Sequence, residues 1–326
     1  MSKSSNPSSA SASSTPLLVG ACIAWGVATL LFFLLFTAPG DDGSQPGWFL
    51  VGISLLEMGA FLLASLLCFR NWRSTQIVSG RNVWFWIGLG LMFYTVGNIL
   101  FFIWSTIWKL DPAVSLADFF YISSYIFLAT GMFKAVLPRR LNLEFSQWLI
   151  VVGIGLGGIL LTIFVNLTAA EAAVVPPAPA PAFYLAQEAP PAVPEVVPPA
   201  VPEPVAEASS APGWVLQLNN LLEPLEGVIV LLYQIGDVVL LIIAGTLLVA
   251  FWGGRYSQSW KLIAIAAFCF YIADMFFAYA TNTGTYVEGR LWEVFWTFSA
   301  VFFGLGAVVE NAVSVNSRRS PRRRRG

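Results

Sequence analysis

The stretch FYTVGNILFFIWSTIWKLDPAVSLADFFYISSYIFLATG, residues 93–131, contains the end of one apolar run, a short polar turn and the start of another run. The first run ends near Trp108 and the second begins at Ala117. Apolar runs of roughly 20 residues are long enough to cross a bilayer as an α-helix. The whole chain is 57% hydrophobic and only 11% charged, whereas soluble domains carry about 25% charged residues. The stretch and the composition together predict a polytopic membrane protein.

Eight runs of this kind occur along the chain. They are Leu17–Ala38, Trp48–Phe69, Val83–Trp108, Ala117–Leu137, Phe145–Leu167, Val228–Trp252, Trp260–Thr281 and Leu291–Val313. We therefore expect an all-α integral membrane protein with eight transmembrane helices.

The segments around these runs differ in composition and divide the chain. We expect a disordered tail at 1–15, a first four-helix half at 16–138, a fifth helix at 139–169, an external loop at 170–212, helices six to eight at 213–313 and a basic tail at 314–326. The loop is rich in Pro, Ala, Val and Glu, and repeated proline prevents helix formation, so we expect it to be disordered.

The basic residues predict how the chain is oriented. In an eight-span arrangement only Lys109 and Arg290 fall on one side, so the other 15 of the 17 Lys and Arg residues fall on the side of the two termini. Because cytoplasmic loops carry an excess of Lys and Arg, we expect both termini in the cytoplasm of a bacterial inner membrane.

Residues 270–306 repeat the pattern of residues 93–131. The matching pairs, read at a constant offset except for a slip of one residue in the loop, are Asn98 with Asp274, Asp118 with Glu293, Tyr121 with Trp296 and Gly131 with Gly306. We therefore expect a parallel 4+4 internal repeat. In parallel repeats the two halves are related by an axis along the membrane normal, and binding sites often lie between them.

Polar residues inside or at the ends of the spans are the candidate ligand-binding residues. They are Glu57, Asn98, Asp118, Tyr121, Tyr125, Asp237, Asp274, Glu293 and Trp296. An ionisable group inside a bilayer is costly and often marks a functional site. The alternative is that these groups are neutral and only hydrogen-bond neighbouring helices, at roughly 0.6–2 kcal/mol each.

Asp118 also has a simple structural interpretation. Ser115 and Asp118 have the spacing of a capping box at the start of a helix. Glu293 keeps the acid in the second half, but Arg290 stands where the capping Ser or Thr would be. Capping alone therefore does not predict Glu293, and an acid with an aromatic residue one turn later also suits a hydrogen-bonding or cation–π pocket.

Several function classes lack their usual residues. Histidine is absent, the three cysteines fall inside spans, and no nucleophile–base set is visible. We expect no enzyme activity and no metal site, and the residues indicate no particular cofactor.

The sequence GIGLGG at 153–158 lies in the middle of a span, where Gly153 and Gly157 predict a close helix contact and a possible route to oligomers. The basic tail fits anionic lipid rather than nucleic acid.

The pattern D-P-x-x-S-x-A-D-x-x-Y-x-x-x-Y, from Asp111 to Tyr125, resembles a bacterial multi-span membrane sensory module found N-terminal to diguanylate cyclase and histidine kinase domains. The similarity covers most of spans 2–4 and 6–8. It implies a membrane sensor of a small ligand. No output domain follows the eighth span in this sequence, so the resemblance implies signalling to a partner in trans.

Three functions fit these features. The first is a membrane sensor or regulatory subunit in signal transduction, which binds a small ligand in an outer-half polar cavity. The second is an ion- or proton-coupled transporter that uses the same carboxylates. The third is a scaffold subunit of a larger membrane complex, with 13 Trp and 26 Phe as contact surface.

The charge distribution gives a testable topology. A reporter fused after Gly326 should be active only in a cytoplasmic assay, because 15 of 17 basic residues lie on that side. A tag inserted at Pro190 should be labelled from outside. Periplasmic activity of the C-terminal fusion would contradict the topology.

Overall fold

The computed structural model describes residues 10–40, 44–110, 114–137, 144–174, 211–251 and 257–323, and the regular elements in these ranges are all helical. Eight helical segments are long and apolar enough to cross a membrane, as the sequence predicts, which indicates a multi-pass membrane protein. The predicted turn at Asp111-Pro112 and most of the predicted 170–212 loop lie outside the described residues.

The helices follow the predicted runs with a few differences at their ends. In chain order they are α1 (Ala10–Phe36), α2 (Gly47–Arg73), α3 (Arg81–Phe102) with the π-helical turn η1 (Ile103–Ile107), α4 (Leu116–Val136), α5 (Phe145–Val174), α6 (Gly213–Leu222), η2 (Glu223–Leu225), α7 (Glu226–Ala250), α8 (Ser257–Asn282), η3 (Leu291–Glu293) and α9 (Val294–Arg323). Helix α1 begins before the predicted Leu17, and α5 continues past residue 169. A separate short helix, α6, precedes the sixth span.

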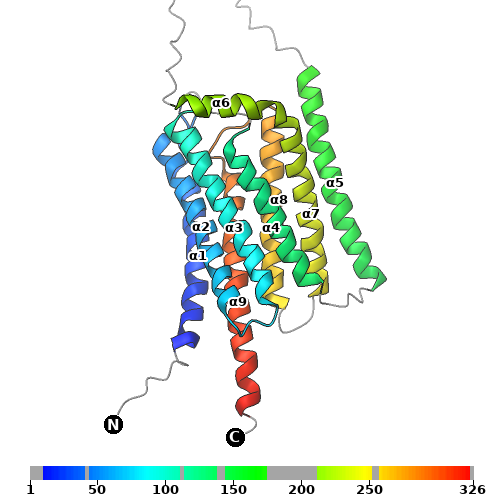
Figure 1. Cartoon of the computed structure of the whole chain (residues 1–326). Coiled ribbons are helices and arrows are strands. Elements are labelled where there is room, and N and C mark those ends of the chain that lie inside the picture. Colours follow the sequence, from blue (N-terminus) through cyan, green and yellow to red (C-terminus); the bar gives the residue numbers. More distant parts are fainter. Residues whose placement is uncertain are drawn as a thin grey trace, which may run out of the picture.

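Six of the long helices form a closed ring. Around the ring, α2 packs on α3, α3 on α4, α4 on α7, α7 on α8, α8 on α9, and α9 on α2. Helix α1 lies outside the ring against α9 and α2, and α5 lies outside it against α7 and α8. Helix α6 crosses one end of the bundle, whereas α1 begins and α9 ends at the opposite end (Figure 1). We call these the α6 end and the terminal end.

Aromatic contacts between α3 and α8 cross the centre of the ring. The buried rings of Trp84 and Trp260 lie 5.8 Å apart, and those of Tyr94 and Phe270 lie 5.1 Å apart. Buried side chains from all six ring helices join these rings in one apolar cluster. The close packing of this cluster holds the two halves of the chain together.

Glycines allow the closest helix contacts within each half. A Cβ atom on Gly131 of α4 would lie 2.8 Å from the backbone N of Ile87 and 3.1 Å from the carbonyl O of Val83. A Cβ atom on Gly306 of α9 would lie 3.1 Å from the carbonyl O of Ser259. Helices α4 and α9 can therefore approach α3 and α8 closely only because these positions lack a side chain.

The predicted contact through Gly153 and Gly157 does not occur within the chain. A Cβ atom on either residue would meet nothing within 4 Å. Helix α5 instead packs on α7 through Gly155 and Gly158, where a Cβ atom would lie 3.1 Å from Ile242 and 2.5 Å from Leu241. The G-x-x-x-G spacing identified a glycine-rich packing helix, but the contact within the chain uses another face of it, because spacing alone does not show where the neighbouring helix lies.

At the terminal end a buried glutamate holds the loop between α2 and α3. Glu310 of α9 is fully buried, and its carboxylate accepts hydrogen bonds from the Ser79 backbone N (3.3 Å) and the Ser259 hydroxyl (2.8 Å). The backbone N of Val78 donates to the hydroxyl of Ser314 (3.3 Å). Helix α9 is thus fixed to α8 and to the 74–80 loop before it leaves the bundle.

The glycine contacts predict unequal effects of adding one methyl group. Gly131→Ala and Gly306→Ala should each lower the melting temperature in detergent, because relieving such a contact costs about 1–3 kcal/mol. Gly153→Ala should melt at or slightly above the wild-type temperature, since its Cβ meets nothing. Equal melting temperatures for Gly131→Ala and Gly153→Ala would contradict the close α3–α4 contact.

Candidate functional site

The first chain of polar contacts joins α2, α3 and α4. The side-chain amide of Asn98 on α3 donates to a carboxylate oxygen of Glu57 on α2 at 2.9 Å. The hydroxyl of Tyr121 on α4 donates to the amide oxygen of Asn98 at 2.7 Å. Asn98 therefore uses both its donor and its acceptor to connect three helices.

A second chain of contacts joins α4 to α7, α8 and α9. The hydroxyl of Tyr125 on α4 lies 2.9 Å from a carboxylate oxygen of Asp237 on α7 and 2.6 Å from one of Asp274 on α8. The indole Nε1 of Trp296 on α9 donates to the other oxygen of Asp274 at 2.7 Å. We call the residues of these two chains of contacts the carboxyl network: Glu57, Asn98, Tyr121, Tyr125, Asp237, Asp274 and Trp296.

The tyrosines of α4 reach their partners because each ring lies against a glycine. A Cβ atom on Gly97 of α3 would lie 2.7 Å from the ring of Tyr121, and one on Gly236 of α7 would lie 2.6 Å from the ring of Tyr125. In each case the next residue along the chain is the hydrogen-bond acceptor, Asn98 or Asp237. The missing side chain allows the ring to lie on the helix, so that its hydroxyl reaches the polar residue beside it.

Aromatic rings lie next to the network. The ring of Tyr94 stacks on Phe61 at 4.1 Å and contacts the rings of Tyr121 at 4.9 Å and Phe270 at 5.1 Å. The ring of Tyr125 also contacts Phe270 at 5.3 Å. The polar groups are therefore placed beside π surfaces, which attract cations.

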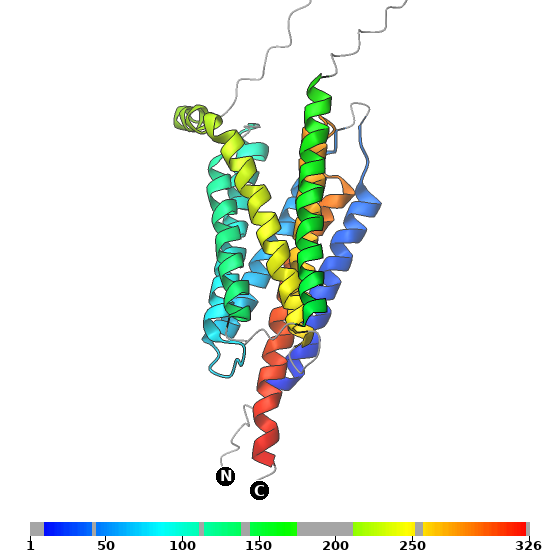
Figure 2. The same ribbon diagram turned by 90° about the vertical axis from the view of Figure 1, so that its right-hand side faces the viewer.

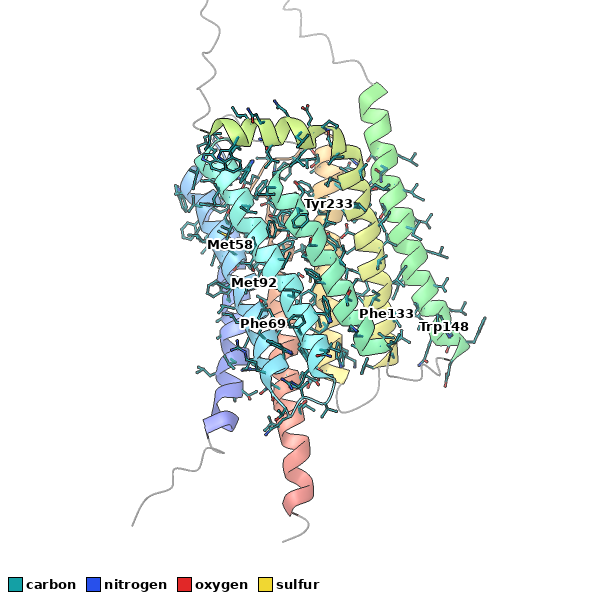
Figure 3. All side chains as sticks on the ribbon, in the orientation of Figure 1. Met58, Phe69, Met92, Phe133, Trp148 and Tyr233 are labelled. Atoms are coloured by element: carbon teal, nitrogen blue, oxygen red, sulfur yellow. The ribbon has the colours of Figure 1, made fainter. Side chains whose placement is uncertain are left out.

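The burial of the network varies from group to group. Asp237 is 2% exposed and Tyr125 is buried as well, whereas Glu57, Asn98 and Asp274 are half-buried. Figure 3 shows Tyr233, a neighbour of Asp237 one turn earlier on α7, in the half of the bundle toward the α6 end. The network is thus closed around Asp237 and more open at Glu57 and Asp274.

The hydrogen-bond donors to these carboxyls are neutral. In the ranges that the structure describes, Glu57 accepts from Asn98 and Asp274 accepts from Trp296, and the Tyr125 hydroxyl lies within hydrogen-bond distance of both Asp237 and Asp274. Among the described residues, the charged groups that interact with Glu57 include Asp274, Glu288 and Glu293, which are also acidic. No group of three His, Cys, Asp or Glu side chains placed to hold a metal ion occurs among the residues described.

Counting hydrogens shows what the Tyr125 contact requires. A tyrosine hydroxyl carries one hydrogen, and ionised carboxylates carry none. Both short contacts of Tyr125 can be hydrogen bonds only when either Asp237 or Asp274 is protonated. The protonated carboxyl then donates to the tyrosine oxygen, and the tyrosine donates to the other carboxylate. When both are ionised, one of the two contacts has no hydrogen, and a cation bound beside them would compensate the added negative charge. The geometry therefore suits exchange between a proton and a cation.

Asp118 has two roles. One oxygen accepts from the Ser115 backbone N at 2.7 Å, and the Ser115 hydroxyl accepts from the Ala117 backbone N, which confirms the predicted capping box. The other oxygen accepts from the hydroxyl of Tyr233 on α7 at 2.8 Å. Asp118 therefore both starts α4 and ties it to α7.

Glu293 makes its hydrogen bonds outside the carboxyl network. It caps the start of its helix, although the sequence pattern did not predict this. Both of its carboxylate oxygens accept from the Gly289 backbone N at 3.0 Å, and one also accepts from the Arg290 backbone N at 3.4 Å. The helix start uses backbone donors and the left-handed backbone of Gly289 (φ 86°) in place of a Ser or Thr. An acid can cap a helix in this way without the usual partner three residues earlier.

Sequence reasoning missed three contributors to this region: Tyr233, Gly97 and Gly236. Each has a signal in the sequence. Gly97 and Gly236 directly precede the polar residues Asn98 and Asp237, and Tyr233 lies one helical turn before Asp237. A glycine next to a polar residue within a span indicates that an aromatic side chain from another helix can approach there.

Comparison of the chain with protein-family models, with curated proteins and with solved structures found no match. The contacts described above are therefore the basis on which its function is argued.

The bridging hydroxyl can be tested by removing a single oxygen. Tyr125→Phe keeps the ring on Gly236 but removes the contacts with Asp237 and Asp274, so it should cost about 1–3 kcal/mol of stability. Tyr279→Phe, on the exposed face of α8, is the matched control and should melt like the wild type. If both variants melt alike in detergent, the hydroxyl does not hold α4 to α7 and α8.

Proposed function

We propose that this protein is a membrane-embedded sensor or regulatory subunit. A small cationic ligand binds at the carboxyl network, and the response passes to a signalling partner. The observation that carries the proposal is the Tyr125 hydroxyl, which comes from the first half of the chain and bridges two carboxyls of the second half at 2.9 and 2.6 Å. A cation that changes this bridge changes how the halves are joined.

The chemistry of the surroundings favours a cation as ligand. Glu57, Asp237 and Asp274 have neutral donors, and Tyr94, Phe61 and Phe270 supply ring surfaces beside them. Carboxylates next to aromatic rings suit an organic ammonium group as well as an inorganic ion. Glu57 and Asp274 are the more open members of the network, so the ligand would enter there.

We also infer that the fold is a parallel 4+4 repeat. Equivalent contacts in the two halves support it. Tyr121 donates to Asn98 as Trp296 donates to Asp274, both at 2.7 Å. The packing of α2 on α9 corresponds to that of α7 on α4.

The glycine contacts and the central tryptophans follow the same correspondence. Gly131 lies against the carbonyl of Val83 as Gly306 lies against that of Ser259, both at 3.1 Å from the position of a Cβ atom. Trp84 and Trp260, which also correspond, lie in contact at the centre, with their rings 5.8 Å apart. The outer helices differ, since α1 packs on α9 and α2 but α5 packs on α7 and α8. The repeat therefore describes the ring better than its surroundings.

The orientation follows from charge. The 15 basic residues grouped with the termini support a bacterial inner-membrane location with both ends in the cytoplasm. The carboxyl network then lies toward the external face. A ligand would reach it from outside the cell.

An ion- or proton-coupled transporter is the second candidate. The observation that favours it is the position of the carboxyls within the spans, at contacts between the two halves. Carriers built from repeats place their coupling-ion sites in such positions. Uptake of the stabilising cation by proteoliposomes that contain the purified protein would favour the carrier over the sensor.

The cation proposal is tested by melting curves in detergent with sodium, potassium, calcium or choline, each in a series of pH values. At least one cation should raise the melting temperature of the wild type by several degrees. Asp274→Asn and Glu57→Gln keep the size and the hydrogen-bonding capacity of the side chain but remove its charge, so both should lose this stabilisation while remaining folded.

Glu223→Gln is the matched control, because Glu223 is exposed on η2 and lies outside the network. It should respond to the cation like the wild type. If no cation or pH affects the wild type differently from Asp274→Asn and Glu57→Gln, the network only joins helices and the ligand proposal is wrong.

A further inference from the structure

Helix α6 is oriented differently from every span. It lies across the α6 end of the bundle in Figure 1 and is seen end-on in Figure 2, so it is roughly perpendicular to the long helices. The turn η2, which contains Pro224, separates it from α7. Although residues 213–250 are apolar enough to be one span, the chain bends at Pro224 and only α7 continues through the bundle.

One face of α6 is fixed to the end of α3. Val215 is fully buried, and the side-chain oxygen of Asn219 accepts a hydrogen bond from the indole Nε1 of Trp104 at 3.1 Å. The ring of Trp214 contacts the rings of Trp104 at 6.3 Å and Trp108 at 6.1 Å. These contacts hold α6 across the bundle.

One flank of α6 is apolar and exposed. Trp214 is 56% exposed and Leu221, seven residues later, is 73% exposed, and Leu225 continues the same surface into η2. Seven residues are about two helical turns, so Trp214 and Leu221 share this flank. Helix α7 also has exposed apolar residues: Val228, Leu231, Leu232, Ile235 and Val239. In a bundle that spans a membrane, exposed apolar side chains of this kind face the acyl chains.

The neighbouring face of α6 is polar. Asn220 is exposed and points about 100° away from Leu221 around the helix. Tryptophan is enriched at membrane–water boundaries because its ring is apolar and its N–H is polar. A helix with one apolar flank and a polar top is the kind that lies in the plane of the interface.

We propose that α6 is an interfacial helix that lies in the plane of the membrane at the α6 end. Its flank of Trp214, Leu221 and Leu225 contacts the acyl chains, and its Asn220 face is in contact with water. The partner of this surface is the phospholipid bilayer itself. The inference does not depend on the function proposed above.

The placement of α6 also fixes the depth of the carboxyl network. Asp237 lies eleven residues after Glu226, the first residue of α7, which corresponds to about 16 Å along the helix. Half of a typical hydrocarbon core is about 15 Å. With α6 at the interface, Asp237 and its Tyr125 bridge lie at the inner limit of the bilayer leaflet on the α6 side.

The test uses nitroxide labels on the full chain in phospholipid vesicles. Cys22, Cys68 and Cys269 are first replaced by alanine, and Leu221→Cys, Leu225→Cys and the control Asn220→Cys are then labelled one at a time. Collision with oxygen, which partitions into lipid, is compared with collision with a water-soluble nickel chelate. Labels at 221 and 225 should collide with oxygen several times more, relative to nickel, than the label at 220.

Two results would overturn the proposal. If the labels at 221 and 225 are as accessible to nickel as the label at 220, this flank lies in water. If they are shielded from both oxygen and nickel, protein rather than lipid covers it. Because all three sites are exposed, the labels should not disturb the bundle, and an unchanged melting temperature of the labelled chains checks this.

Discussion

A carboxyl group inside a bilayer has no water to bond with, so its hydrogen bonds must come from a neighbouring helix. In this chain Tyr121 and Tyr125, one turn apart on α4, meet that requirement in opposite directions. Tyr121 reaches Asn98 on α3, and Tyr125 reaches Asp237 on α7 and Asp274 on α8. Helix α4 therefore connects the two halves on one side of the ring, as the packing of α9 on α2 does on the other.

The two halves are not equivalent at this connection. In the proposed repeat, Tyr125 corresponds to Ala300. Glu57 and Asp237 lie at the same depth in their spans and correspond to each other, so Gly236, on which the Tyr125 ring lies, corresponds to Leu56. At one contact a tyrosine lies on a glycine. At the corresponding contact of the other half, an alanine and a leucine occupy these positions. As a result Glu57 has Asn98 as its partner, but no tyrosine that crosses from α9. Two carboxyls are therefore bridged by a tyrosine in one half, whereas the single carboxyl of the other half, Glu57, has an amide as its partner.

The sequence predicted the spans and the cap of α4, because length, hydropathy and the Ser115–Asp118 spacing are local properties. It also selected the members of the carboxyl network, since a polar residue is conspicuous in an apolar run. It did not predict their pairing across helices, such as Tyr233 with Asp118, nor the packing of α5 through Gly155 rather than Gly153. Periodicity shows which residues share a face, but the neighbour of that face depends on the packing of the whole bundle.

Helix α9 is in contact with both ends of the molecule. Near the α6 end Trp296 donates to Asp274, and about 21 Å further along the helix Glu310 accepts from Ser79 and Ser259. Asn71 of α2 also donates to the carbonyl of Ala307, at 2.8 Å, in this second region. A change in the charge of Asp274 alters the acceptor of the Trp296 indole N–H. Trp296 lies on α9, which is fixed at the terminal end by the hydrogen bonds of Glu310. In the proposed sensor, α9 is therefore a direct connection between the network and the terminal end, and it shares this role with α8, which carries both Asp274 and Ser259.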